Sequence, residues 1–499
     1  MAENPAEDAS GDPELPPAMQ AAWQRAVAAG NAGRYGEALA TVQDLLARHP
    51  DHNSVLHTAA RIAHNAHDSE RAFRLAWDLS RRSRGVYARH QAYSLMAFWA
   101  PFVSYLNRQG VAAVGRQWAQ HLAAVMRGAP LPPQAPRPAA RRLRVGYMSP
   151  AFGFPSDYQP LGHHDPDRLE TFAYSSAARP LGRGTVVPKF GTFRDLHGQS
   201  DSDAARRIRQ DDLDILVDLG GTGDAQRNGI LAYRPARIQV GWSNKLIPQY
   251  GPLMDWIIGD AELFAAGDFV DEGGARLLAL PQAVCAVVEM KQPPAPAPPP
   301  SLAGGRLTIG SPASAYKISE ATLALWSRIL HRLPRAVFAY TTPFLSDLVE
   351  RKIRDGFAAH GIGPERYSLT VRRDGDFPTA MNAVDLALDA IPFSSNFSCL
   401  QTLRQGVPVV TLAGDRLAGR FSSSILRTVG HPELIAETPD AYVETALALA
   451  SAPDRLRDYR ARLPAAVRQA GLEDMRRTAD LLELAYERMW QMREGQEDG

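Results

Sequence analysis

The sequence contains little cysteine and little lysine. Cys285 and Cys399 are the two cysteines among 499 residues, and only five of the 55 basic residues are lysines. Two cysteines cannot build a disulfide framework or a four-cysteine zinc site, so we expect a protein of the reducing cytoplasm. Because lysine is rare, a lysine beside a predicted site is a stronger candidate for a functional role.

Long apolar runs and an excess of one charge are also absent. No stretch of 18 apolar residues occurs. The first residues, MAENPAEDASGDPE, are acidic, whereas a secretory signal begins with a basic segment followed by an apolar one. We therefore expect neither a membrane-spanning helix nor a secretory signal. The 55 basic and 54 acidic residues give a net charge of +1, so no overall positive field predicts nucleic-acid binding.

The composition is typical of a soluble globular chain with several domains. Apolar residues make up 45% and charged residues 22%, and the length predicts about three domains. Two proline-rich stretches, APLPPQAPRPAARR and QPPAPAPPPS, cannot be helix or strand interiors. The predicted parts of the chain are a disordered acidic tail (1–18), a helical domain (19–128), a linker (129–142), an N-lobe (143–291), a second linker (292–301) and a C-lobe (302–490).

The helical domain carries a repeat-like pattern. The segment GRYGEALATVQDLLARHP places Gly33, Tyr35, Ala38 and Pro50 at the spacing of the second helix of a tetratricopeptide repeat, and Ala72 follows Ala38 after one repeat length. The alternative is that an ordinary alanine-rich helical hairpin produces the same pattern. Stacked helical pairs form concave grooves for extended peptides, so the repeat predicts a protein partner.

Both later segments alternate short apolar strands with helices. Near-continuous apolar strands separated by helices indicate parallel sheets covered on both faces. The predicted fold class is therefore a multi-domain α+β protein, in which a tetratricopeptide-like helical domain precedes two Rossmann-like α/β lobes. Ligands of such lobes bind at the carboxyl ends of the strands. Strands are predicted at 143–149, 171–174, 214–221, 238–242, 255–258, 306–312, 336–340, 367–371, 386–388 and 408–412.

A polar loop in the C-lobe is the first candidate site. A predicted strand ends near Asp389, and a helix begins after the loop residues Ser394, Ser395, Asn396 and Ser398. The free backbone N–H groups at a helix start bind anions and would suit a diphosphate. The alternative is that Ser398 only caps the helix.

Lys317 is the second candidate. It lies after the first strand of the C-lobe and just before a helix, in SPASAYKISEATLALWSRIL. Its ammonium could meet the same anion as the polar loop, whereas the alternative is a solvated surface charge. The presence of both features in one lobe favours a shared phosphate site.

Three long segments resemble one known family. RPARIQVGW (234–242) with DWIIGD (255–260) resembles the RPAP(I/V)QVxW and DYIIxD motifs of the O-GlcNAc transferase and SPINDLY family. AYKISEATLALWSRILHRLP resembles its YKI block, and LDAIPFSSNFSCLQTLRQGVPVVTLAGDRLAGRFSSSIL resembles its LDTFPYNGHTTTCDALWxGVPVVTL block. The resemblance extends from about Leu143 to Trp490, and the tetratricopeptide-like prefix fits it.

The resemblance implies a fold and an activity. The fold is GT-B, with two Rossmann-like lobes, and the activity is that of an inverting glycosyltransferase that needs no obligatory metal. Such an enzyme transfers a sugar from a nucleotide-sugar donor, such as UDP-N-acetylglucosamine, to a protein side-chain hydroxyl. The C-lobe is expected to bind the donor, the N-lobe to face the acceptor, and residues 19–128 to dock the acceptor protein.

The family pattern implies donor-site residues at matching positions of this chain. Lys317 occupies the family's lysine position and is expected to contact the donor diphosphate, where its charge offsets the charge on the leaving group. Gln401 stands where the family has an aspartate that holds the ribose, and Arg420 matches an arginine that we interpret as structural. The complete expected donor site is Tyr316, Lys317, Ser395, Asn396, Phe397, Ser398 and Gln401, with Asn396, Phe397 and Ser398 in place of the family's His-Thr-Thr.

The N-lobe departs further from the family pattern. Its first loop reads SPAFGFPSDYQPLGHHDPDRL, without the family's histidine, and Thr222 replaces a second histidine. An inverting transfer needs a base near the acceptor hydroxyl. Asp157 is our first candidate for that catalytic base, ahead of Tyr158 and His164; the alternative is that Asp157 is a turn residue after Pro-Ser. The acidic segment DDLD (211–214) precedes a strand, away from the carboxyl ends, so we do not interpret it as a metal site.

The altered loops leave other functions open. The donor could be a nucleotide-activated nonulosonic acid such as a CMP-sugar, with flagellin as the acceptor, because bacterial tetratricopeptide-fused relatives resemble flagellin-modifying enzymes. The chain could also be a non-catalytic adaptor with a vestigial cleft. A third alternative is transfer to a small or lipid-linked glycan.

Overall fold

The computed structural model describes most of the chain. Described are residues 15–497, with gaps at 51, 84–85, 126–130, 138–140, 151, 153–158, 178–190, 222–226, 243–252, 266, 268–274, 285–293 and 372–376. Within these residues, no helix has the length and apolar character needed to cross a membrane.

The chain folds into two compact units, each built from separated segments. Among the described residues, the first unit contains 112–284 and 471–497, and the second contains 15–111 and 294–470, with the gaps given above. The predicted C-lobe, 302–490, is thus divided between the two units at Gly471. The predicted boundaries of the helical domain and the lobes stay predictions.

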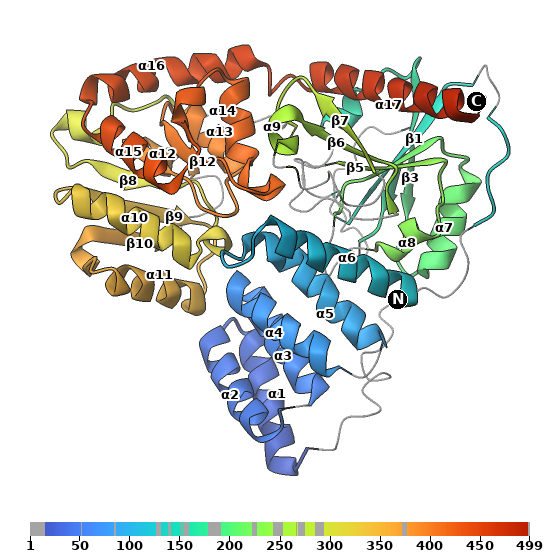
Figure 1. Cartoon of the computed structure of the whole chain (residues 1–499), viewed down its shortest axis with the longest axis horizontal. Helices are drawn as coiled ribbons and strands as arrows, with labels where there is room; N and C mark the ends of the chain where they lie inside the picture. Colours follow the sequence, from blue (N-terminus) through green and yellow to red (C-terminus); the bar gives the residue numbers. More distant parts are fainter. Residues whose placement is uncertain are drawn as a thin grey trace. The chain divides into compact units, whose positions relative to one another are not determined.

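The second unit begins with a series of antiparallel helices (Figure 1). Small residues make their close packing feasible: Ala38 of α2 and Ala72 of α4 occupy equivalent places in successive hairpins and are both buried. Asp68 caps α4 by accepting a hydrogen bond from the N–H of Arg71. The helices and the short 3₁₀ segment η1 are α1 (Pro17–Asn31), α2 (Tyr35–Arg48), α3 (Asn53–Asn65), α4 (Ser69–Arg82), α5 (Val86–Trp99), η1 (Ala100–Phe102) and α6 (Arg108–Val125), of which α6 continues into the first unit.

The first unit contains a seven-stranded parallel sheet. The strand order is β3-β2-β1-β4-β5-β6-β7. The strands are β1 (Leu143–Ser149), β2 (Leu169–Ser175), β3 (Thr192–Asp195), β4 (Ile215–Asp218), β5 (Ile238–Trp242), β6 (Trp256–Asp260) and β7 (Arg276–Leu280). Helices of the same unit are η3 (Gln159–His163), α7 (Asp201–Gln210), α8 (Gly229–Ala232), α9 (Ala261–Phe264) and α17 (Met475–Glu497).

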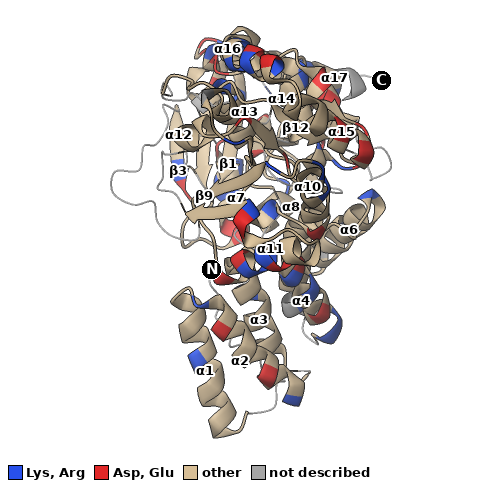
Figure 2. Ribbon diagram, turned by 90° about the vertical axis from the view of Figure 1, so that its left-hand side faces the viewer, with Lys and Arg blue, Asp and Glu red and all other residues tan. Residues whose placement is uncertain are grey.

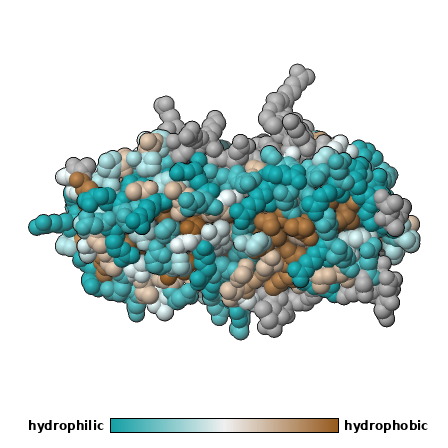
Figure 3. Space-filling view, turned by 90° about the horizontal axis from the view of Figure 1, so that it is seen from above, coloured by the Kyte–Doolittle hydropathy of each residue, from teal (hydrophilic) through white to brown (hydrophobic). Residues whose placement is uncertain are grey.

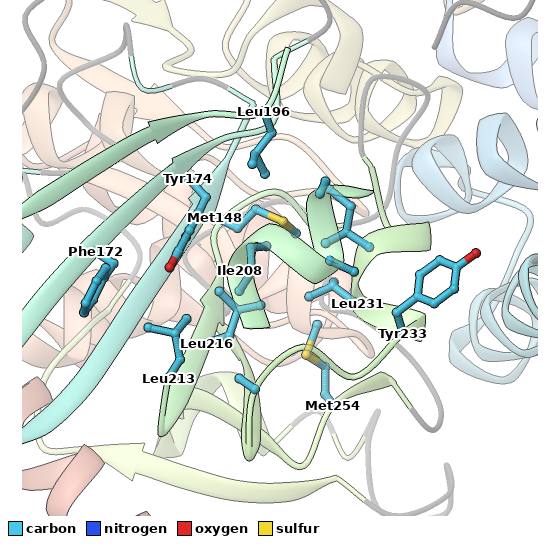
Figure 4. Close-up of a cluster of buried hydrophobic side chains, with 14 of the residues drawn as sticks. Met148, Phe172, Tyr174, Leu196, Ile208, Leu213, Leu216, Leu231, Tyr233 and Met254 are labelled. Atoms are coloured by element: carbon cyan, nitrogen blue, oxygen red, sulfur yellow. The ribbon is translucent and has the colours of Figure 1, made fainter. Parts of the chain in front are cut away.

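One core of this unit lies between the sheet and α7 and α8. Met148 and Leu216 from neighbouring strands pack against Ile208 of α7 and Leu231 of α8 (Figure 4). These side chains are nearly completely buried, and each contributes roughly 1.5–3 kcal/mol of hydrophobic stabilisation. The continuous burial of β4 and β5 explains why apolar runs predicted them.

The second unit contains a six-stranded parallel sheet in the order β10-β9-β8-β11-β12-β13. The strands are β8 (Thr308–Gly310), β9 (Val337–Thr342), β10 (Tyr367–Val371), β11 (Leu386–Leu388), β12 (Val409–Leu412) and β13 (Ile435–Ala436). The helices are η5 (Pro300–Ala303), η6 (Ala315–Lys317), α10 (Glu320–Arg332), α11 (Asp347–Ala359), η7 (Pro364–Arg366), α12 (Phe377–Asn382), α13 (Phe397–Arg404), η8 (Leu417–Gly419), α14 (Phe421–Thr428), η9 (Pro432–Leu434), α15 (Pro439–Ala450) and α16 (Pro453–Ala470).

The strand order places two loops of the second unit together. The first strand, β8, lies beside β11, and the chain continues outward from this pair in both directions. The loops that follow β8 and β11 therefore leave the same edge of the sheet at its topological switch point. This is the usual ligand-binding position of such sheets, and it contains both segments that the sequence singled out.

Charges of one sign do not form a continuous stripe on the described helices that Figure 2 shows. Basic and acidic residues are mixed along α11, and few charges lie on α1 to α3 (Figure 2). The face seen from above is mainly hydrophilic with separate apolar patches (Figure 3). This mixed distribution agrees with the near-neutral net charge.

Candidate active site

The candidate site is built around residues 389–398, which we name the donor loop. The loop begins where β11 ends and stops at the start of α13. Asp389 fixes its shape: one carboxylate oxygen accepts hydrogen bonds from the backbone N–H of Ala390 (2.9 Å) and of Ser395 (2.8 Å). The other oxygen accepts one from the Thr411 hydroxyl at 2.9 Å. The buried carboxylate therefore holds both ends of the turn against β12.

Ser394 joins the donor loop to a neighbouring helix. Its hydroxyl accepts hydrogen bonds from the backbone N–H groups of Phe421 (2.9 Å) and Ser422 (3.4 Å) at the start of α14. Ser422 in turn donates to the carbonyl oxygen of Ser395 at 2.9 Å. Ser394 and Ser395 are fully buried, so the middle of the loop is a fixed part of the protein interior.

Lys317 contacts this loop directly. It lies in η6, after β8, and only 5% of the residue is exposed. Its Nζ donates a hydrogen bond of 2.8 Å to the carbonyl oxygen of Ser394 and lies 4.4 Å from the centre of the Phe393 ring. The alternative of a solvated surface charge does not hold, because the ammonium is buried at the switch point against the donor loop.

The first turn of α13 presents backbone N–H groups that have no hydrogen-bond partner among the described residues. Asn396 precedes the helix and makes no capping hydrogen bond with its side chain. Among the described residues, the backbone N–H groups of Phe397 and Ser398 have no hydrogen-bond partner, and both residues are half-buried. The buried Ser395 hydroxyl also has no partner within the described part of the chain. Free N–H groups at a helix start beside an ammonium form an arrangement that can bind an anion.

Gln401 and Tyr316 have different surroundings. Gln401 is half-buried and follows Phe397 by four residues, on the same face of α13. Tyr316 packs its ring against the rings of His67 (5.3 Å between centroids) and Phe102 (5.5 Å), which belong to the helical segments of the same unit. Burial raises the pKa of Tyr316, so its hydroxyl stays protonated at neutral pH.

The surroundings of two further residues near the donor loop, Cys399 and Arg420, favour a structural role. Cys399 of α13 is buried, and burial raises the pKa of its thiol far above the ordinary value. It is therefore a poor nucleophile. The Nε of Arg420 donates a hydrogen bond of 2.8 Å to the carbonyl oxygen of Gly414, which agrees with its interpretation as a structural arginine.

The candidate base of the N-lobe cannot be placed. Asp157, Tyr158 and Thr222 lie outside the described residues. His164 is described, and it is buried with both ring nitrogens engaged: Nε2 lies 2.6 Å from the Tyr147 hydroxyl and Nδ1 lies 3.1 Å from a carboxylate oxygen of Glu483 in α17.

The surroundings of His164 set its charge. Burial lowers the pKa of His164, although the hydrogen bond with Glu483 acts in the opposite direction. Burial alone would raise the pKa of Glu483, but hydrogen bonds from His164 and from the N–H of Asp165 leave it below the usual value. A neutral histidine beside an ionised glutamate holds α17 on the N-lobe, which is a structural role.

The acidic segment 211–214 is occupied by arginines. Asp211 pairs with Arg194 at 2.6 Å, and Asp214, whose side chain is fully buried, pairs with Arg141 at 2.8 Å. Asp212 pairs with Arg237 at 2.8 Å. These ion pairs fix the loop before β4.

A polar pocket lies elsewhere in the second unit. It has a volume of about 420 Å³ and lies between α4, α10 and α11, without any residue of the donor loop in its wall. Inside it the buried Glu70 pairs with Lys352 at 2.9 Å. The pocket therefore does not enlarge the candidate site.

Known proteins resemble the chain in sequence. It matches glycosyl transferase family 41 over residues 106–267 and 312–482. It is 30% identical over 362 residues to a tomato (Solanum lycopersicum) protein named probable UDP-N-acetylglucosamine–peptide N-acetylglucosaminyltransferase SPINDLY, which covers 70% of this chain and 39% of that protein. A UDP-N-acetylglucosamine–peptide N-acetylglucosaminyltransferase of Caenorhabditis elegans is 24% identical, over 70% of this chain and 41% of its own length. The chain thus spans about two-fifths of the length of these relatives.

A solved structure has the same fold. The match to a mutant O-GlcNAc transferase of Thermobaculum terrenum has a TM-score of 0.69 and 24% sequence identity, and covers 95% of this chain and 98% of that one. The predicted fold class, a helical region followed by the two Rossmann-like lobes of a GT-B protein, is thereby confirmed. The family match extends over two thirds of the sequence and includes Lys317 and the whole donor loop. The chain belongs to glycosyl transferase family 41.

Proposed function

We propose that this protein is a protein glycosyltransferase that transfers a sugar from a nucleotide-sugar donor to a side-chain hydroxyl. The observation that carries the proposal is the contact between Lys317 and the donor loop, beside the unbonded N–H groups at the start of α13. Family membership supports it, because the named relatives are UDP-N-acetylglucosamine–peptide transferases.

The donor site would act on the leaving group. In the proposed reaction the acceptor oxygen attacks the anomeric carbon, the bond from that carbon to the diphosphate oxygen breaks, and the nucleoside diphosphate leaves. Lys317 and the N–H groups of Phe397 and Ser398 would bind the diphosphate and stabilise the charge that develops on it. The attack from the opposite face inverts the configuration, and we assign removal of the acceptor proton to Asp157.

The donor is proposed to be UDP-N-acetylglucosamine or a related UDP-sugar. Gln401 would hydrogen-bond the ribose in the place of the family's aspartate. Differential scanning fluorimetry with UDP, GDP, CMP and their sugars tests this assignment, because a ligand at 100 times its dissociation constant adds about 2.7 kcal/mol of stability. We expect UDP and a UDP-sugar to raise the melting temperature, with and without EDTA. Stabilisation by CMP-sugars alone would favour the nonulosonic-acid alternative.

Transfer itself needs a separate experiment. Incubating the full chain with a radiolabelled UDP-sugar and a peptide library should label hydroxyl-bearing peptides, with residues 19–128 docking the acceptor protein. Labelling of a small or lipid-linked glycan but of no peptide would overturn the protein acceptor. Failure of every nucleotide to bind would favour the non-catalytic adaptor.

A further inference from the structure

An aromatic residue of the helical segments lies against the donor loop. Phe102 ends η1, which follows α5, and its ring stacks on that of Phe393 with centroids 4.2 Å apart and planes 12° from parallel. Both residues are completely buried. Phe393 is the neighbour of Ser394 in the donor loop, so the Phe102 ring brings the helical segments into contact with the candidate site, which His67 also reaches through Tyr316.

Lys317 contacts the same Phe393 ring. Its Nζ lies over the Phe393 ring at 4.4 Å from the centre. The Phe102 ring is stacked on the same Phe393 ring, with centroids 4.2 Å apart. The electron-rich face of a ring attracts a cation, and the attraction grows when water is excluded. Phe393 thus contacts both Lys317 and Phe102, and a change in the position of Phe102 reaches the ammonium through this ring.

Hydrogen bonds attach the segment that carries Phe102 to the lobe that contains the donor loop. The Arg416 guanidinium donates hydrogen bonds to the carbonyl oxygens of Val103 (3.2 Å) and Leu106. The backbone N–H of Arg108 donates to the Asp415 carboxylate at 3.0 Å. These contacts hold η1 and the turn after it against the region of η8, so the position of Phe102 relative to the donor loop is set on both sides.

From this geometry we infer that Phe102 is a positioning residue for the donor site and couples the helical segments to Lys317. The inference rests on the proposed function, because it assigns the effect to donor binding. A displacement of the helices by a bound acceptor would move Phe102, and through Phe393 would alter where the ammonium and the Ser394 carbonyl lie. Phe102 touches no donor atom and acts through the two rings that it contacts, those of Phe393 and Tyr316.

A matched pair of substitutions separates positioning from general packing. Phe102→Leu keeps an apolar side chain but removes the flat ring, and Phe73→Leu does the same to a buried phenylalanine of α4, whose neighbouring rings belong to Trp77 and Tyr105 of the helical segments. Both variants are measured by titration calorimetry with UDP and by thermal melting. We expect Phe102→Leu to weaken UDP binding about tenfold, which is about 1.4 kcal/mol. Phe73→Leu should lower the melting temperature about as much as Phe102→Leu does, but it should leave the UDP affinity unchanged.

A second readout does not depend on nucleotide. Cys399 is buried directly behind the donor loop, so in a Cys285→Ser background its reaction with a thiol reagent reports loosening of the loop. Phe102→Leu should speed the labelling of Cys399 at least several-fold more than Phe73→Leu does. Equal labelling in the two variants, or equal UDP affinity, would overturn the inference. If the unsubstituted protein binds no UDP, the proposed function fails, and the labelling comparison still decides whether Phe102 positions the loop.

Discussion

The carboxylate of Asp389 lies 2.8 Å from the backbone nitrogen of Ser395 and closes the donor loop on the strand from which it leaves. In the sequence, Asp389 marks only the end of a predicted strand. Its three hydrogen bonds show that the loop is preorganised, so a bound anion would not have to order it.

Removing the charge of Asp389 should therefore weaken binding of the nucleotide-sugar, although the Asp389 side chain is expected to make no contact with it. Asp389→Asn replaces one acceptor oxygen by a donor that faces another N–H or hydroxyl, and hydrogen bonds to charged groups contribute about 1.5–3 kcal/mol each. We expect a lower unfolding midpoint in urea and weaker UDP binding. Asp385→Asn is the control, since Asp385 is equally buried but bonds Ser301 and Thr308. UDP affinity that falls equally in both variants would contradict a specific role of the loop.

The buried ion pairs of Asp214 should be essential for the first unit. Asp214→Asn removes the fully buried negative charge that pairs with Arg141 and Arg237. Removing one partner of a buried ion pair typically costs about 3–5 kcal/mol. We expect denaturant unfolding to show a loss of that size, whereas Asp203→Asn, at an exposed pair with Arg206, should change stability little. A stable Asp214→Asn variant would contradict the assignment.

His164 should affect stability and not chemistry. His164→Ala removes one partner of the Tyr147 hydroxyl, which also bonds the Tyr486 hydroxyl, and one partner of the buried Glu483. Unsatisfied buried groups cost about 1–3 kcal/mol, so urea unfolding should occur at lower concentration. The transfer rate per folded molecule, measured with saturating donor, should stay unchanged. A large loss of rate with unchanged stability would restore His164 as a candidate base.

Stability should fall in acid because of His67. Burial, together with the charge of the nearby His64, lowers its pKa to about 4, while the unfolded value is about 6.5. Protonation therefore favours the unfolded chain: the contribution is complete above about pH 6.5 and is lost as the pH falls toward about 4. His67 has a positive φ of 60°, which asparagine tolerates. In His67→Asn, the difference between the urea midpoints at neutral and mildly acidic pH should shrink; an identical difference would contradict the assignment.

The sequence predicted the buried strands well and the edge strands poorly. β1, β5 and β11 have the predicted bounds, since continuous apolar residues signal them. Of the edge strands only β10 has the predicted bounds, because its apolar residues alternate with polar ones. β3, β7 and β13 were not predicted. β3 lies at the sheet edge with no buried residue, and β13 has two residues, so neither carries a hydrophobic pattern. Such strands form because a neighbouring strand is already in place.

The candidate site was predictable as far as topology determines it. The rule that ligands bind at the switch point was enough to bring Lys317 and Ser394 together across 77 residues. The clamp of Asp389 and the ring of Phe102 depend on side-chain contacts between distant segments, which no local pattern encodes. The attachment of α17 to the N-lobe through Glu483 is unpredictable for the same reason.

The central claim is that the Lys317 ammonium binds the donor diphosphate, and calorimetric titration of UDP tests it most directly. Lys317→Met keeps the buried stem and removes the charge, and Lys352→Met is the control, because Lys352 pairs with Glu70 away from the donor loop. The account predicts that UDP binds the unsubstituted protein and the control with similar affinity and binds Lys317→Met at least about a hundredfold more weakly, a difference of about 2.7 kcal/mol. Equal UDP affinity in Lys317→Met and the unsubstituted protein would contradict it.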